Sequence, residues 1–233
     1  MKIKSALVTQ ASGSIGGLTA SRNRGGMYLR ARSIPLDPGT PFQQFIKATV
    51  ADLSNQWVNV LTSVQRDSWN EYALNVPLPD TLGELRNIGG LAHFVRSHVP
   101  RRQTPAAALP DVLTGPGVFD TGEFTPFSAP VVDASADTLT ITFDDTDACA
   151  NEEDAGACIL CSRPQNPSIN YFKGPYRFAA TVLGAALPPT EPAVVTLPFP
   201  VAAAGQVVFI QVRVTRADGR LSYAQRLRAV AVA

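Results

Sequence analysis

Residues 207–232, VVFIQVRVTRADGRLSYAQRLRAVAV, decide the fold of the C-terminal half of the chain. Two apolar runs, Val207–Thr215 and Leu221–Val232, flank the short segment Arg216-Ala217-Asp218-Gly219-Arg220. An Asp-Gly pair between two such runs is a strong signal for a β-hairpin. The stretch therefore predicts two antiparallel strands joined by a tight turn.

The residues that precede this hairpin indicate further strands. Leu139, Ile141 and Phe143 alternate with threonines, which is the period of a strand with one buried face. Other short candidate strands span 157–163, 176–183 and 193–197, with Pro- and Gly-rich connections and no helical pattern between them. We therefore expect residues 131–233 to form an antiparallel β-sandwich of the immunoglobulin or fibronectin kind.

Residues 40–99 have the periodicity of helices instead. Thr40-Pro41-Phe42-Gln43 supplies an N-cap, a proline at the first helical position and a capping-box glutamine, and Thr62–Gln65 repeats the capping box. A third short helix is expected near 90–96. One face of the first helix collects eight apolar residues: Phe42, Phe45, Ile46, Val50, Leu53, Trp57, Val60 and Leu61. Trp57, Trp69 and Tyr72 are candidates either for the core of this small helical unit or for aromatic anchors to a partner.

Residues 1–39 are expected to be an extended basic arm. Glycines interrupt any helix, and the apolar residues are too sparse and aperiodic for a core. The first 34 residues contain six Lys or Arg and no acidic residue. Five arm residues are candidate partner contacts: Arg22, Arg24, Tyr28, Arg30 and Arg32. Residues 100–130, rich in Pro, Gly and Ala, are expected to be a linker that wraps a surface, which completes an α+β chain.

Charge and composition exclude several classes of protein. The net charge of +1 divides into +6 for residues 1–110 and −5 for residues 111–233, which indicates a basic arm that seeks an acidic protein surface. Because the total is balanced, nucleic acid is not the expected partner. No apolar run approaches the length of a membrane span, and the one near the N-terminus is too short for a signal peptide.

One motif resembles an enzyme family. Ala6–Gly17, ALVTQASGSIGG, is similar to the nucleotide-binding opening of short-chain dehydrogenases, in which a strand, a glycine-rich turn and a helix hold the pyrophosphate. Gln10 stands where the first glycine of that family would be, and no βαβ alternation follows. His93 and His98 are five residues apart and do not share a helical face, so surface or cap roles are expected. We find no nucleophile–base pair and expect neither catalysis nor a cofactor.

Metal binding has two weak candidates. Cys149, Cys158 and Cys161 are three possible zinc ligands, but Cys158 and Cys161 lie at an odd offset in a predicted strand, so their sulfurs should point apart. Buried thiols or one disulfide are the expected alternative. Six acidic residues crowd loop 144–154 without the spacing of an EF-hand. Calcium binding by this loop remains an alternative. The loop is also a candidate binding surface for the basic arm of a neighbouring subunit.

Five segments together resemble structural proteins of tailed bacteriophage particles. They are GSIGG…SRNRGG (13–26), RARSIP (30–35), TPFQQ (40–44), QRDSWNEYA (65–73) and the terminal sandwich. The resemblance covers most of the chain and contains no catalytic motif. It implies a virion component that assembles in the host cytoplasm and has an arm attached to the capsid or the tail.

The leading hypothesis is accordingly a head decoration, or cement, protein. Its arm would clamp subunits of the major capsid protein or other virion proteins, and several copies would assemble together. A tail, adaptor or fibre protein is the alternative of the same class. A carbohydrate-binding module is the alternative of a different class, with Tyr171, Phe172 and Tyr176 as its candidate aromatic platform.

Overall fold

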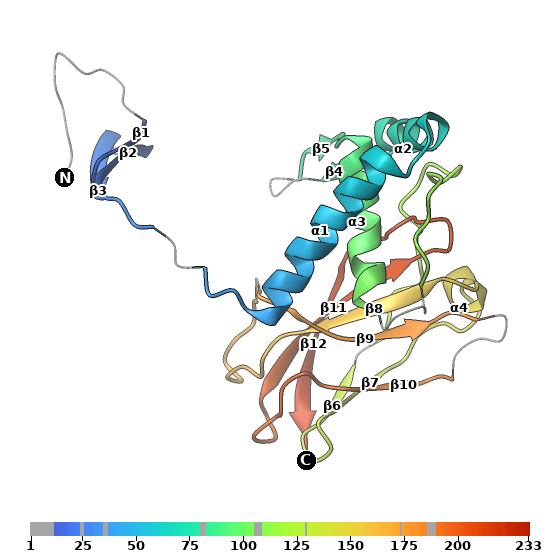
Figure 1. The fold of residues 1–233 in the computed structure, drawn as a ribbon. Coiled ribbons are helices and arrows are strands. Elements are labelled where there is room, and N and C mark those ends of the chain that lie inside the picture. Colours follow the sequence, from blue (N-terminus) through green and yellow to red (C-terminus); the bar gives the residue numbers. More distant parts are fainter. Residues whose placement is uncertain are drawn as a thin grey trace. The chain divides into compact units, whose positions relative to one another are not determined.

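The computed structural model divides the chain into two compact units, Met1–Gln44 and Phe45–Ala233. The structure describes residues 12–23, 26–34, 37–79, 83–104, 109–128, 130–172, 174–185 and 190–233. Helix α1 (Pro41–Asn59) begins just before the division. Figure 1 labels the elements and colours them along the sequence, from blue at the N-terminus to red at the C-terminus.

The first unit contains a three-stranded antiparallel meander of β1 (Gly13–Ile15), β2 (Leu18–Asn23) and β3 (Gly26–Ala31). The backbone of Gly16 has a φ of +56°, which lets the chain reverse between the first two strands. The Arg32 N–H donates to the Gly17 carbonyl at 2.8 Å and extends the ladder. The described segments of the arm are therefore extended strands that pair with one another, a pairing that was not predicted.

The second unit opens with helices that begin where the capping signals place them. At α1, the Gln43 N–H donates to Thr40 Oγ1 and the Thr40 N–H donates to Gln43 Oε1. The capping box of Thr62 and Gln65 opens α2 (Ser63–Asn75). Only part of the predicted apolar face of α1 is covered: Leu53 and Leu61 are buried, whereas Phe45, Val50 and Val60 are exposed.

Helix α3 (Gly90–Gln103) is longer than expected and passes through Pro100. The linker was expected to start at this residue because residues 100–130 are rich in Pro, Gly and Ala, and a proline inside a helix also lacks the N–H that would bond to the preceding turn. The side chain of Arg101 instead holds the last turn in place. Its Nε donates to the Pro110 carbonyl at 2.9 Å, and its Nη1 donates to the Arg216 carbonyl at 2.8 Å. The boundary predicted at residue 100 is therefore wrong, and the linker begins after α3.

Seven strands of the second unit form one hydrogen-bonded sheet in the order β10-β7-β6-β12-β11-β8-β9. Their bounds are β6 (Val131–Asp133), β7 (Thr138–Ile141), β8 (Gly156–Cys161), β9 (Arg177–Leu183), β10 (Ala193–Thr196), β11 (Val207–Thr215) and β12 (Gln225–Val232). Sequence analysis missed β6, and it placed the start of β12 at Leu221. Four-residue helix α4 (Ala148–Asn151) and a two-stranded ribbon of β4 (Leu78–Pro79) and β5 (Leu85–Arg86) complete the unit.

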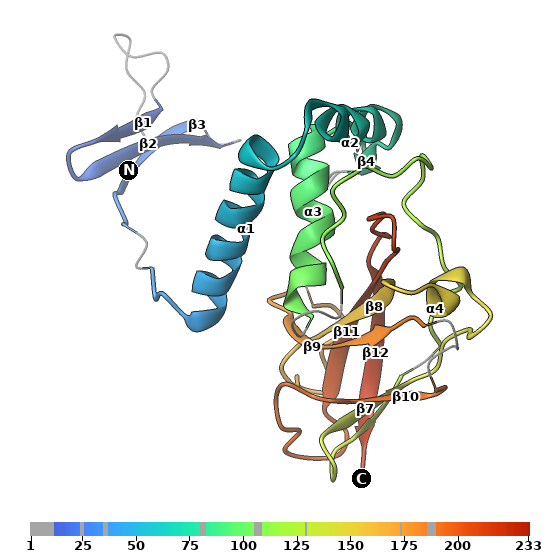
Figure 2. The same ribbon diagram turned by 45° about the vertical axis from the view of Figure 1, so that its right-hand side comes forward.

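The sheet curls around an apolar core. Its core includes residues from strands near both edges, such as Val195 of β10 and Ile159 of β8, together with Ile210 of β11. Figure 2 shows β7 and β10 lying across from β8 and β9. This arrangement agrees with a sandwich or near-barrel. One detail differs from the expected antiparallel topology, because β12 and β6 pair in parallel.

The helices and the linker form a second apolar cluster in the same unit. Leu53, Trp69, Tyr72 and Phe94 are fully buried in it, and Leu113 of the linker packs against them. The Trp69 indole N–H donates to the Leu113 carbonyl at 3.1 Å, and the Gly115 N–H donates to Ser68 Oγ at 2.8 Å. Residues 113 and 115 of the linker therefore lie against the helices. None of the helices that the structure describes is long and apolar enough to cross a membrane.

Candidate assembly interface

The three-stranded meander of the first unit is amphipathic. Because strand residues alternate between faces, the pairing of Ile15 with Leu18, and of Leu18 with Ala31, places these residues on one face. The full apolar face contains Ile15, Leu18, Ala20, Met27, Leu29 and Ala31, and Arg22 lies among them. The opposite face contains Ser14, Thr19, Ser21, Tyr28 and Arg30. Ile15 is 89% exposed and Leu18 is 50% exposed, so much of the apolar face is uncovered.

The predicted contact residues of the arm therefore fall on two faces. Tyr28 and Arg30 share the polar face, and Arg32 follows just beyond the end of β3. Arg22 lies on the apolar face, opposite Met27. Arg24 lies outside the described residues. The side chains of Arg22, Arg30 and Arg32 are exposed, and Tyr28 is half-buried.

Sequence analysis missed the apolar face of the arm. The signal was present, because Leu18 and Ala20 alternate with Thr19 and Ser21, and Met27, Leu29 and Ala31 alternate with Tyr28 and Arg30. This alternation of apolar and polar residues covers only four or five positions in each strand, and the neighbouring glycines favoured an irregular arm. A search for period two in windows of five residues would have found it.

The three aromatic anchors proposed in the helical unit do not form a partner surface. Trp69 and Tyr72 are 0% exposed, so both belong to the core. Trp69 contacts Tyr72 edge-on at 6.0 Å between ring centroids, and the Tyr72 hydroxyl donates to the Asp120 carbonyl at 2.7 Å. Trp57 is half-buried, with its ring centroid 5.7 Å from that of Phe94. The anchor interpretation is wrong for Trp69 and Tyr72.

The two histidines are core residues and do not lie at the surface, contrary to expectation. His93 and His98 are both fully buried, and burial lowers the pKa of each to about 4. His98 Nε2 accepts a hydrogen bond from the Val112 N–H at 2.8 Å. Its Nδ1 therefore carries the proton and donates to the Phe94 carbonyl at 2.7 Å. Both hydrogen bonds use neutral imidazole, which joins α3 to the linker.

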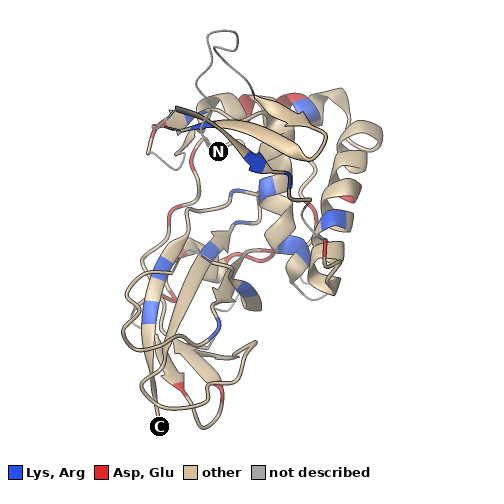
Figure 3. Cartoon of the chain, turned by 90° about the vertical axis from the view of Figure 1, so that its left-hand side faces the viewer, with Lys and Arg blue, Asp and Glu red and all other residues tan. Residues whose placement is uncertain are grey.

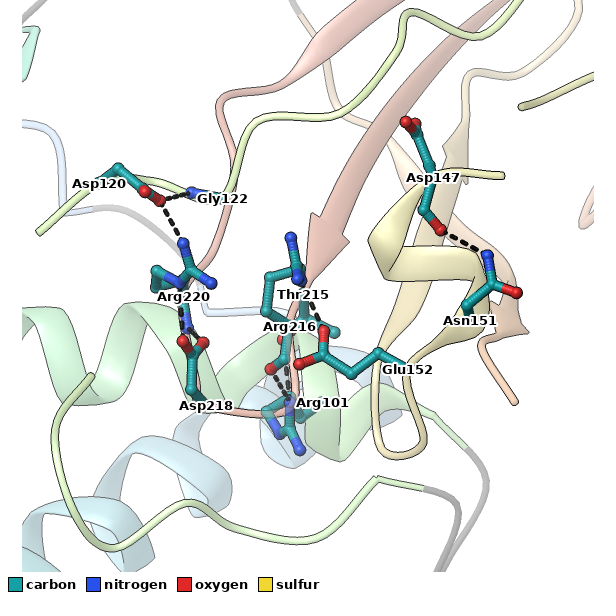
Figure 4. A network of polar contacts seen from close by, with 10 residues as sticks. All are labelled: Arg101, Asp120, Gly122, Asp147, Asn151, Glu152, Thr215, Arg216, Asp218 and Arg220. Carbon is teal, nitrogen blue, oxygen red and sulfur yellow. Dashed lines mark hydrogen bonds and ion pairs between the residues drawn. The ribbon is translucent and has the colours of Figure 1, made fainter. Parts of the chain in front are cut away.

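A polar junction connects α3, the linker and the turn between β11 and β12 (Figure 4). Besides its two carbonyl partners, Arg101 donates from Nη1 to Thr215 Oγ1 at 3.0 Å. Arg220 reaches Asp120 at 2.6 Å and Asp218 at 2.7 Å. Burial alone would raise the pKa of Asp120, but the Gly122 N–H and the Arg220 guanidinium outweigh it and lower that pKa. The helical unit and the sheet are thus held together by buried and half-buried charge.

Three of the six carboxylates of the acidic loop 144–154 make contacts within the chain. Glu152 accepts from Arg216 Nε at 2.5 Å, and Asp147 accepts from the backbone and the hydroxyl of Thr125. Asp144 caps its own turn by accepting from Thr146. Across the described residues, no three His, Cys, Asp or Glu side chains come together as metal ligands. The loop contributes to the junction, and its exposed members, Asp145, Glu153 and Asp154, remain at the surface.

The cysteines are free thiols. Cys161 lies in the apolar core, whereas Cys158 lies on the other face of β8, with Sγ 3.8 Å from the Pro100 carbonyl. The two sulfurs therefore point apart, as the odd offset predicted. Burial raises the pKa of Cys158 to about 11 and that of Cys161 to about 12, so neither is a thiolate at neutral pH.

The aromatic residues of loop 171–176 do not make a flat platform. Phe172 stacks on Phe209 with a centroid distance of 5.6 Å, and Tyr176 meets Phe172 edge-on at 85°. Of the three candidates only Tyr171, which is 69% exposed, offers a free ring. A sugar-stacking surface built on all three residues is therefore not formed.

The dehydrogenase-like motif lacks the context that such chemistry needs. Its residues 6–11 lie outside the described part. From Gly13 onward the chain forms β1, a turn and β2, so the glycines lead into a second strand and not into a helix. No helix N-terminus is placed here to receive a pyrophosphate.

Comparison with known proteins gives no family. No protein-family model matches the chain, and no curated protein is similar to it in sequence. An Fn3-like protein from Clostridium thermocellum is similar in structure at 17% identity and a TM-score of 0.29, over 48% of this chain and 93% of that one. The adhesin domain of Epf from Streptococcus pyogenes is similar at 14% identity and a TM-score of 0.29, over 53% of this chain and 34% of that one. Likenesses this weak carry no argument about function.

Proposed function

We propose that this protein is a non-enzymatic structural subunit of a tailed-bacteriophage particle, a head decoration protein that clamps capsid subunits through its N-terminal arm. The observation that carries the proposal is the arm's amphipathic meander, which exposes an apolar face that includes Ile15 and Leu18. A three-stranded sheet of this size has no core of its own. A partner surface that covers the apolar face would stabilise it.

The charge of the arm supports a protein partner with an acidic surface. Arg22, Arg30 and Arg32 are exposed, and residues 1–34 contain no acidic residue to neutralise them. The partner would present an apolar strip for one face of the meander and carboxylates for its arginines. The major capsid protein or another virion protein is the partner we propose, within a virion assembled in the host cytoplasm.

The second unit would serve as the outward body of the subunit. Its strands suit an immunoglobulin- or fibronectin-like sandwich, and Arg101 joins helix α3 to the end of β11 through two hydrogen bonds. Many copies on one shell would add weak contacts through effective concentration. Association between copies is therefore part of the proposal.

Deletion of residues 1–34 tests the proposal. We expect the truncated protein to fold, because the arm is a separate unit, and to be missing from purified particles assembled in its presence. A triple variant, R22Q/R30Q/R32Q, retains the strands of the meander and removes three of the six positive charges of residues 1–34. Its occupancy should be lower than that of the wild type at low salt and should fall less steeply with rising salt, because salt screens the charge contacts that the variant lacks. Normal occupancy of particles by the truncation would defeat the proposal.

Copy number separates the two structural alternatives. A decoration protein would be present in hundreds of copies per particle, whereas a tail, adaptor or fibre protein would be present in a small ring or trimer. Densitometry of gel-separated particle proteins, with the major capsid protein as internal standard, measures this ratio.

A further inference from the structure

The outer face of β11 and β12, turned away from the apolar core, carries a group of arginines. Ile210 and Val212 of β11 belong to the core, so Gln211 and Arg213 point outward. Arg226 of β12 is the direct partner of Gln211 in the strand register, and therefore shares this outer face. Arg213 is half-buried and Arg226 is exposed, so the group extends from the interior to the solvent.

Helix α3 adds a third arginine. Arg96 Nη2 donates to the Ser222 carbonyl at 3.1 Å, next to the start of β12. Burial lowers the pKa of Arg96 to about 10, and the positive charge of Arg213 acts in the same direction. Burial also lowers the pKa of Arg213, and the charge of Arg226 adds to that effect. The guanidinium of Arg213 is thus within electrostatic range of Arg96 and of Arg226.

These arginines have no anionic partner in the described chain. No described carboxylate forms an ion pair with Arg96, Arg213 or Arg226, whereas in the polar junction Arg216 contacts one carboxylate and Arg220 contacts two. Two buried N–H groups, Nη1 of Arg96 and Nε of Arg213, donate to no atom that the structure describes. Figure 3 shows the basic residues of the chain in blue, including those of α3 and β12.

We propose that Arg96, Arg213 and Arg226 form a binding site for an oxyanion, either a phosphate or a carboxylate group. Buried N–H donors without acceptors and converging like charges both cost free energy, and one oxyanion would remove both costs. Guanidinium groups bind such oxygens in a forked geometry that lysine cannot offer. Arg226 and the exposed ring of Tyr223 mark the side from which the ligand enters. The site lies in the second unit and does not depend on the arm.

Thermal unfolding of the full-length protein with inorganic phosphate tests this site, at an ionic strength held constant with chloride. A hundredfold excess of phosphate over its Kd should raise Tm by about 5 to 10 °C. R213Q and R226Q should lose most of this shift. R163Q is the matched control, because Arg163 is an exposed arginine that lies over the Phe199 ring, and this variant should retain the shift.

The variants also separate a lost ligand from a damaged fold. Without phosphate, R213Q should unfold at the same temperature as the wild type or higher, because it removes a charge that Arg96 and Arg226 repel. Acetate in place of phosphate identifies the source of the ligand: a shift with acetate alone indicates a carboxylate, and a shift with phosphate alone indicates a phosphate. Absence of a shift with both anions, or an equal shift in R213Q, would overturn the proposal.

Discussion

Gly219, in the turn between β11 and β12, lies close against Trp69 of the helical unit. Its φ is +89°, and a Cβ atom added there would lie 3.1 Å from Cη2 of Trp69. Both the backbone conformation and the close approach therefore favour glycine. Gly205 has a similar φ of +86° but open space around it.

This pair of glycines allows a matched measurement. We expect Gly219→Ala to lower the free energy of unfolding by about 2 kcal/mol, and Gly205→Ala to lower it by about 1 kcal/mol, because only the first adds crowding to backbone strain. Urea unfolding followed by Trp fluorescence measures both. Equal losses in the two variants would show that the contact with Trp69 has no energetic weight.

Tyr72 allows a second test at the residue scale. The test separates a role in the core of the helical unit from a role in binding a partner. Tyr72→Phe removes the donor to the Asp120 carbonyl and leaves the ring in place. The free energy of unfolding should fall by about 1 kcal/mol. Binding to particles should be unchanged, since the side chain is fully buried. A loss of particle binding by a normally stable Tyr72→Phe protein would return this residue to the interface.

The buried histidines make stability depend on pH. Their pKa falls from an ordinary 6.5 to about 4 in the folded chain, so the unfolded chain binds more protons between these values. Stability should therefore be full above pH 6.5 and decrease as the pH falls toward 4, by roughly 3 kcal/mol for each histidine. His98→Gln, whose side-chain oxygen can accept from the Val112 N–H, should halve the slope. An unchanged slope would mean that folding does not change the pKa of His98.

At the scale of elements, the two faces of the arm's meander can be compared by placing the same charged residue on each. Ile15→Asp places a charge on the apolar face, whereas Ser14→Asp places one on the polar face one residue away. We expect Ile15→Asp to reduce particle occupancy at least tenfold, and Ser14→Asp to have little effect. Quantitative binding to particles stripped of the native protein measures both. Equal effects would indicate that the arm binds through charge alone.

Local rules predicted the elements that local chemistry determines. The capping boxes at Thr40 and Thr62 fixed two helix starts, and the Asp-Gly turn at 218–219 fixed the hairpin. The end of α3 could not be predicted, because Arg101 stabilises it through residues that are 9 and 115 positions away. The parallel pairing of β6 with β12 depends in the same way on contacts that are distant in the sequence.

The exposed basic residues of the arm could be predicted from the sequence, but its apolar face was missed. The excess of positive charge identified the arm, and Arg22, Arg30 and Arg32 are indeed exposed. The apolar face of the arm was not predicted, because it depends on how three short strands pair. The prediction of Trp69 as a partner anchor failed because the linker, which is distant in the sequence, covers this side chain.

At the scale of the whole molecule, the second unit should unfold as one. The helical cluster and the sheet share Arg101, Arg96 and the linker, so neither can open without breaking buried contacts of the other. Trp fluorescence, which reports the helical cluster, and far-UV circular dichroism, which reports all elements, should give coincident transitions in urea. Arg101→Met should lower the midpoint of both together. Two separate transitions would show that the junction does not couple the parts.

The central position of β12 also restricts the order in which the body can form. Strands β10, β7 and β6 lie on one side of it and strands β11, β8 and β9 on the other, so the halves are joined in the sheet only through residues 225–232. A ribosome must therefore have released that segment before the halves can close. The arm emerges far earlier, so its strands and their exposed apolar face can form while the sheet of the second unit is still incomplete.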